Sequence, residues 1–121
     1  FKTSGGGYAD VFGREFIAVS DKAHKDNIKK ATFNALEKIS STPVYIYTFK
    51  KDENQEQHLG LIYQETPDEI KSTNKEKKSI SLYATSSMLW KGMQELTDLV
   101  ETQQNMIKIL TERLDKLEKK E

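Results

Sequence analysis

A short polar segment contains the residues with the clearest potential for chemistry. Ser20 is followed five positions later by Lys25, in a stretch that also holds Asp21 and Asn27. A serine hydroxyl attacks a carbonyl when a neighbouring base takes its proton, and a neutral lysine amine is able to act as that base. An ordinary lysine has a pKa near ~10.4, whereas a general base works best near about 7 to 8. Catalysis by this pair therefore needs surroundings that favour the neutral amine, such as burial.

The spacing of the pair constrains the backbone between its two members. Five residues of a regular helix rotate by roughly 140°, so Ser20 and Lys25 cannot meet on one face of a helix. Either the chain is extended or turned at Ser20, or Lys25 comes from a neighbouring chain. As a pattern alone, the pair is weak evidence for catalysis, and a solvated polar loop is the ordinary interpretation.

Other kinds of site have less support. Two histidines, His24 and His58, are too few for a His-based metal site without carboxylate help, and the absence of cysteine excludes a Cys-based site, so we expect no metal and no cofactor. The glycines at 5–7 lack the Gly-Lys-Ser/Thr of a phosphate-binding loop. The net charge of zero argues against a nucleic-acid partner. No apolar run approaches the roughly 20 residues that cross a bilayer, which argues against a membrane partner.

The first two thirds of the chain predict a small mixed globule. A β-like run at 14–19 leads into Ser20, and a short helix with Thr32 as its cap is expected at 32–39. Aromatic and β-branched residues at 44–49 and 58–63 predict two strands that flank a charged loop. Pro67 starts a helical turn. The fold class is therefore α+β: a small β-rich globule with short helices, followed by a long C-terminal helix.

The last third predicts a coiled coil. Its core positions recur in steps of four and three, with a residues Met93, Val100, Ile107 and Leu114 and d residues Leu89, Leu96, Gln103, Leu110 and Leu117. β-branched a residues with Leu at d favour two strands, but Leu99 and Met106 at g widen the stripe, which suits three helices better. The heptads alone therefore favour a parallel trimer without deciding against a dimer. The alternative is one helix packed on its own domain, yet no domain is left to cover the charged end at 111–121.

Taken together and in this order, the segments resemble the C-terminal intramolecular chaperone domain of phage tail spikes, tail fibres, neck appendages and endosialidases. The domain is also similar to the self-cleaving module of the myelin regulatory factor. The similarity covers Val19 to the end of the chain. It rests on Ser20-Asp21 with Lys25-Asp26-Asn27-Ile28, Ala35 to Ile39, Tyr45-Ile46-Tyr47, His58 to Glu65, and Gln94-Glu95-Leu96.

The resemblance implies a serine-type autoprotease that cuts its own chain between Val19 and Ser20. Ser20 is then the nucleophile and Lys25 the general base, with Asn27 and Asp21 as supporting residues. Residues 1–19 are expected to end an upstream fibre or spike stalk. Residues 20–121 form the chaperone, with a globular part at 20–81 and the coiled-coil helix at 82–121.

The resemblance also implies the partners and the place of action. The chain is expected to form a homotrimer and to act on the upstream part of its own polypeptide. It would work in the host cytoplasm during phage assembly, while the mature parent protein sits on the virion tail or neck. Three alternatives stay open: a trimerisation or attachment module that never cuts, a self-cleaving release module of a regulatory DNA-binding protein, and a receptor-adhesion domain.

Overall fold

The computed structural model describes residues 8–74 and 76–120. The glycine run at 5–7 and the first part of the predicted upstream segment 1–19 lie outside the described residues, as does residue 121 at the end of the predicted coiled coil. The chain divides into two compact units, Phe1–Ala31 and Thr32–Glu121. The predicted chaperone region 20–121 therefore takes in the end of the first unit and all of the second.

The described residues of the first unit, 8–31, are mostly irregular chain. Among them, one 3₁₀ turn is present, η1 (Lys22–His24). The β-like run predicted at 14–19 is wrong, because residues 14–19 form no strand in the part of the chain that the structure describes. Every described residue of this unit is exposed, so these residues lack the buried face that usually holds a strand in register.

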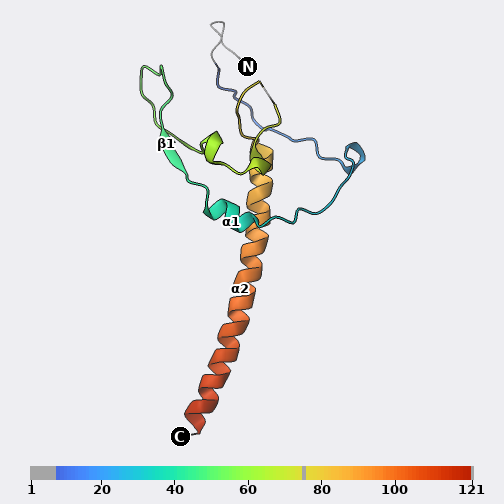
Figure 1. Cartoon of the computed structure of the whole chain (residues 1–121), viewed down its shortest axis with the longest axis vertical. Helices are drawn as coiled ribbons and strands as arrows, with labels where there is room; N and C mark the ends of the chain where they lie inside the picture. The colour runs from blue at the N-terminus through green and yellow to red at the C-terminus, as the bar shows by residue number, and fades with distance from the viewer. Residues whose placement is uncertain (1–7, 75, 121) are drawn as a thin grey trace. The chain divides into compact units, whose positions relative to one another are not determined.

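The second unit confirms the α+β class. Its elements follow in the order α1 (Ala35–Ser40), β1 (Tyr45–Tyr47), β2 (His58–Gly60), η2 (Tyr63–Glu65), η3 (Asp68–Ile70) and α2 (Leu82–Lys119). Figure 1 shows α2 as a single long helix with α1 beside its first half. The globule is less rich in β-structure than predicted, since its sheet has only two short strands.

The helix α1 begins later than the sequence predicted. Its N-cap is Asn34, whose side-chain Oδ1 accepts a hydrogen bond from the Glu37 N–H at 3.0 Å. An Asn followed three residues later by Glu is a known helix start, and Thr32 does not serve as the cap. Ala35 at the start of α1 is completely buried.

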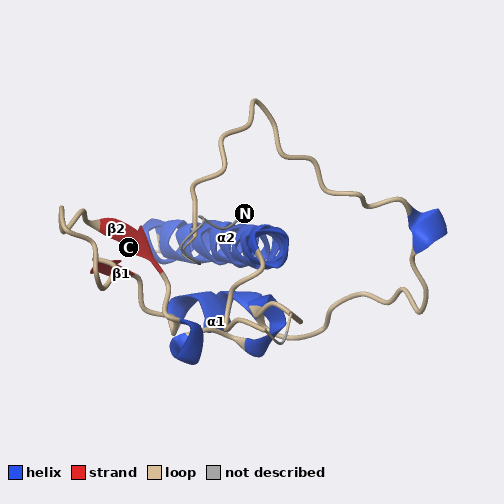
Figure 2. Ribbon diagram, turned by 90° about the horizontal axis from the view of Figure 1, so that it is seen from above, coloured by secondary structure: helices blue, strands red, loops and turns tan. Residues whose placement is uncertain are grey.

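The two strands pair antiparallel, as the predicted hairpin requires. Tyr45 lies opposite Gly60 and Tyr47 lies opposite His58, in the sheet drawn red in Figure 2. Both strands are shorter than predicted. Between them the backbone takes positive φ at Lys51 (69°) and Gln55 (49°), a conformation that ends a regular ladder.

The long helix confirms the predicted start near residue 82. Ser81 caps it, with its Oγ accepting from the Ala84 N–H at 3.1 Å. The buried core is small and consists of Ala35 from α1, Ile70 from η3 and Met88 from α2. These three side chains join the globule to the N-terminal part of the long helix.

A carboxylate on α2 strengthens the contact between the two helices. Glu95 accepts hydrogen bonds from the backbone N–H groups of Ala35 (2.9 Å) and Leu36 (3.2 Å), and pairs with Lys91 at 2.9 Å. It therefore satisfies donors that the first turn of α1 leaves without partners. The Lys91 ammonium holds the pKa of the Glu95 carboxyl below its usual range, and the two backbone N–H groups act in the same direction against partial desolvation.

Candidate active site

The backbone between Ser20 and Lys25 is organised by Asp21. Its carboxylate caps the turn η1 by accepting from the Ala23 N–H at 2.9 Å. The His24 N–H donates to the Asp21 carbonyl and the Lys25 N–H to the Lys22 carbonyl, both at 3.1 Å. Asp21 and Lys25, on either side of the turn, have extended backbone angles. One tight turn between extended residues therefore folds the segment back on itself.

This turn brings the two residues with chemical potential together within one chain. The Lys25 Nζ donates a hydrogen bond to the Ser20 Oγ at 2.6 Å. Of the two geometries that the spacing allowed, the structure has the turned segment, and the contact needs no residue from a second chain. The heavy-atom separation is within the range over which a base takes a proton.

The direction of this hydrogen bond defines what the pair can do chemically. In this structure the lysine donates and the hydroxyl oxygen accepts. To activate Ser20, a neutral Lys25 amine must instead accept the hydroxyl proton. Burial favours the neutral form of a lysine, but in the single chain both residues are exposed. The distance is suitable for catalysis, and the protonation state depends on what covers the segment. The catalytic roles of Ser20 and Lys25 stay a prediction.

The other predicted members of this site have visible local roles. Asp21 is a helix-capping residue, as described above. Asn27 has a φ of 55°, in the left-handed region that Asn tolerates better than most residues because its short polar side chain bonds locally. This backbone conformation is sufficient reason for an Asn at that position. Val19, the residue before the predicted cut, is 83% exposed, so its carbonyl segment is accessible.

The predicted trimer seam forms an apolar stripe along α2 that the single chain does not cover. Its apolar members are all exposed, from Leu96 at 42% to Met93 and Leu117 at 63%. The g residues Leu99 and Met106 extend the same stripe. Contiguous exposed apolar surface of this kind is typical of an interaction surface. Packing of further copies along it, and their number, stay predictions.

The structure also assembles a cluster that the sequence analysis did not recognise. Asp52, Glu56 and His58 have ligand atoms within 4.8 Å of one another in the hairpin loop. Asp52 already accepts from the N–H groups of Asn54 (3.1 Å) and Glu56 (3.0 Å), which is a loop-stabilising role. The His58 ring stacks on Tyr47, with ring centres 5.7 Å apart. These contacts give the side chains of Asp52 and His58 structural functions, and we assign no metal to the cluster.

The comparisons with known proteins give one family match, over less than half of the chain. Residues 20–73 match the model of a peptidase family described as chaperone of endosialidase. The match begins at the residue that follows the predicted cut. No curated protein and no solved structure matches the chain. None of the helices in the described ranges has the length and apolar character needed to cross a membrane.

Proposed function

We propose that this chain, which matches the model of the chaperone of endosialidase family over residues 20–73, is an intramolecular chaperone that removes itself after use. It trimerises and registers an upstream β-rich phage fibre or spike, then cuts the Val19–Ser20 bond. Long-range β-pairing between chains is slow to form, and a parallel coiled coil raises the local concentration of the chains it joins. After the cut, the assembled product lacks the element that assembled it and is held kinetically.

The observation that carries the proposal is the 2.6 Å contact between Lys25 Nζ and Ser20 Oγ at the first residue of the family match. In the proposed reaction, Lys25 takes the hydroxyl proton and the Ser20 Oγ bonds to the Val19 carbonyl carbon. The C–N bond then breaks, and the proton passes to the new amino group of Ser20. Water hydrolyses the resulting ester, which frees the Val19 carboxylate and restores the serine hydroxyl.

Assembly contributes the surroundings of the pair. Because Ser20 and Lys25 already meet within one chain, a second chain is not needed to bring them together. Packing of copies around this exposed segment would exclude water and favour the neutral amine. We therefore propose that cutting reports correct assembly, with desolvation as the link between them.

The decisive experiment is intact mass under denaturing conditions, on fresh and aged protein, for the native chain and for Ser20→Ala and Lys25→Ala. Lys22→Ala is the matched control, because Lys22 lies in the same turn and has the same charge. We expect the native chain and the control to split between Val19 and Ser20 while the other two variants stay whole. If the native chain stays whole although light scattering shows a folded trimer, the domain is a trimerisation module that does not cut.

The upstream partner is a separate part of the proposal. Residues 1–19 would be the end of a phage tail fibre, tail spike or neck appendage, folded in the host cytoplasm and carried on the virion. An upstream sequence of β-fibre type supports this. An upstream immunoglobulin-like DNA-binding domain would instead assign the chain to the release of a regulatory protein.

A further inference from the structure

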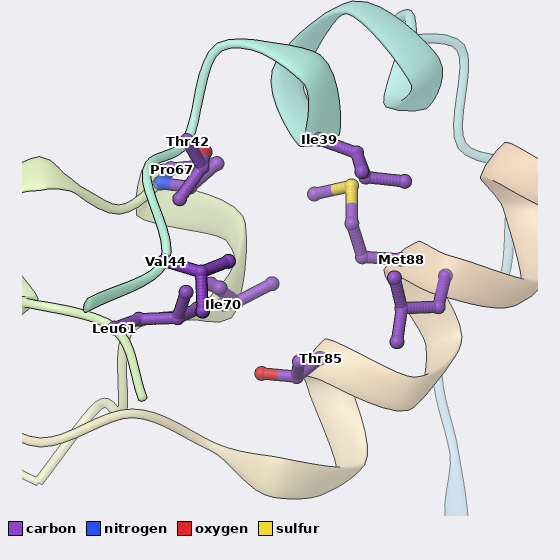
Figure 3. Close-up of a pocket in the computed structure, with 9 residues that line it drawn as sticks. Ile39, Thr42, Val44, Leu61, Pro67, Ile70, Thr85 and Met88 are labelled. Carbon is purple, nitrogen blue, oxygen red and sulfur yellow. The ribbon is translucent and has the colours of Figure 1, made fainter. Parts of the chain in front are cut away.

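The globule and α2 enclose an apolar pocket that the proposed reaction does not use. It has a volume of about 300 Å³, and its walls include Val44, Leu61 and Ile70 from the globule with Thr85, Met88 and Leu89 from α2. Figure 3 shows side chains from both parts directed into the same space. An apolar hollow of this size gains free energy when an apolar group replaces water in it.

The pocket opens beside the trimer seam. Leu89 is a d residue of the seam and also lines the pocket. Two of the lining residues, Leu89 and Val44, are 54% and 62% exposed, so the hollow is reached from outside. A helix that packs against this seam would therefore pass the mouth of the pocket.

The heptad register says which residue of that helix arrives there. Thr85 occupies a g position and Trp90 the e position of the following heptad, counted from Met93 at a. In a parallel coiled coil, e and g residues flank the seam and meet between chains. Thr85 of one copy, which lines the pocket, thus faces Trp90 of a neighbouring copy.

Trp90 is otherwise difficult to explain. It is 73% exposed in the single chain, although tryptophan is highly buried on average. The contacts of α2 with the globule involve its other flank, through Met88, Gly92 and Glu95. The indole therefore lies on the opposite side of the seam from the pocket of its own chain. In a closed ring of copies, each chain would then present its pocket to one neighbour and its indole to the other.

We propose that the pocket of each copy receives the Trp90 indole of a neighbouring copy. This inference rests on the parallel trimer of the proposed function, and it adds an interaction that joins the globules to the coiled coil. The volume is sufficient, since a cavity of about 150 Å³ is large enough for benzene. The pocket wall is almost wholly apolar, and the hydroxyls of Thr42 and Thr85 donate to the backbone carbonyls of Lys38 and Ser81. The pocket therefore suits the apolar rings of an indole.

The experiment uses the full chain with Ser20→Ala, which stays intact under the proposed mechanism. Trp90 is the one tryptophan of the sequence, so its fluorescence reports this site alone. We expect its emission to move to shorter wavelength and acrylamide quenching to fall several-fold over the concentrations at which light scattering shows trimer formation.

Two further variants separate the pocket from general contact with the neighbouring helix. Val44→Phe fills the pocket, whereas Ile46→Phe enlarges a residue two positions later that is also exposed and does not line the pocket. We expect Val44→Phe to return the emission of the assembled protein toward the exposed value, while Ile46→Phe leaves it shifted.

The possible outcomes are distinguishable. A trimer whose tryptophan stays fully quenchable overturns the inference and leaves the proposed chaperone standing. A trimer in which both phenylalanine variants behave alike also overturns it, because burial then comes from the neighbouring helix. A chain that stays monomeric at every concentration overturns both the inference and the proposed trimer.

Discussion

Gly92 permits a close approach between α1 and α2 that a larger residue would disturb. It is buried in the middle of α2, where a glycine is unfavourable for a helix. A Cβ at this position would overlap the Cδ1 of Ile39 from α1. The substitution Gly92→Ala therefore has two opposing effects, one on the helix itself and one on its packing.

The two effects have comparable magnitudes. Replacing glycine by alanine inside a helix stabilises it by about 0.8–1.0 kcal/mol, whereas overpacking a close contact costs about 1–3 kcal/mol. We expect Gly92→Ala to be between neutral and about 2 kcal/mol destabilising, which is the sum of these effects. Ile39→Val removes the Cδ1 that causes the overlap, at its own cost of about 0.5–1.5 kcal/mol. In that background, Gly92→Ala should become stabilising.

The assay is a double-mutant cycle by urea unfolding at one fixed chain concentration, because assembly makes the apparent stability concentration-dependent. Any effect of the Gly92→Ala substitution on the neighbouring seam is present in both backgrounds and cancels in the cycle. We expect a coupling free energy of about 1–3 kcal/mol between the two positions. Equal stabilisation by Gly92→Ala in both backgrounds would refute the packing of Ile39 on Gly92.

Three further outcomes test other parts of the structure. Because the folded pKa of Glu95 is lowered, its contribution to stability is complete above its ordinary value of 4.5 and is lost as the pH falls through the lower folded value. Glu95→Gln should therefore lower the melting temperature above pH 4.5 and lose this part of the acid dependence, while the exposed Glu101→Gln on the same helix should change neither. Asn27→Gly should leave the rate of the proposed self-cleavage near that of the native chain, because glycine also accepts a positive φ. Asn27→Ala should destabilise the turn by about 1–2 kcal/mol. Loss of cleavage in the glycine variant with the turn intact would show that the amide takes part in the chemistry. Gln103→Leu should strengthen assembly but lose uniqueness of register, seen as mixed oligomers in sedimentation, and a single stronger trimer would contradict the register role of Gln103.

Local patterns were sufficient for the elements whose causes lie close in the chain. The body of α2 follows from the heptad repeat that begins at Leu89, whereas its start near residue 82, where Ser81 is the cap, was predicted through the family resemblance. The hairpin follows from two strand-like runs around a charged loop. The start of α1 had a local signal too, since Asn34 with Glu37 resembles a capping box, and the sequence analysis chose Thr32 instead.

Features that depend on distant residues could not be predicted. Glu95 reaches backbone groups some 60 residues earlier, and nothing around it in the sequence indicates that contact. Nor does the composition of 39–89 show that these residues enclose a pocket, because its walls come from segments far apart in the chain. The Ser20–Lys25 contact lies between these cases: the spacing limited the geometries, and the Asp21-capped turn decided among them.

The small core makes folding and assembly difficult to separate in this protein. Three apolar residues are buried in the part of the chain that the structure describes, while the apolar stripe of α2 lies exposed. A single core of this kind supplies little free energy against the entropy of ordering the chain. Under the proposed assembly, another copy would cover this stripe and add apolar burial that the single chain lacks.

The two residues of the proposed cut differ in this respect, because their contact is local. Lys25 reaches Ser20 through one turn, and the two residues are five positions apart in the sequence. The two groups are therefore in contact in the single chain, and assembly is not needed to bring them together. If cutting nevertheless waits for assembly, as the proposed function requires, the control must act on the proton. Exclusion of water from an exposed lysine is the physical change that packing of further copies around this segment would bring.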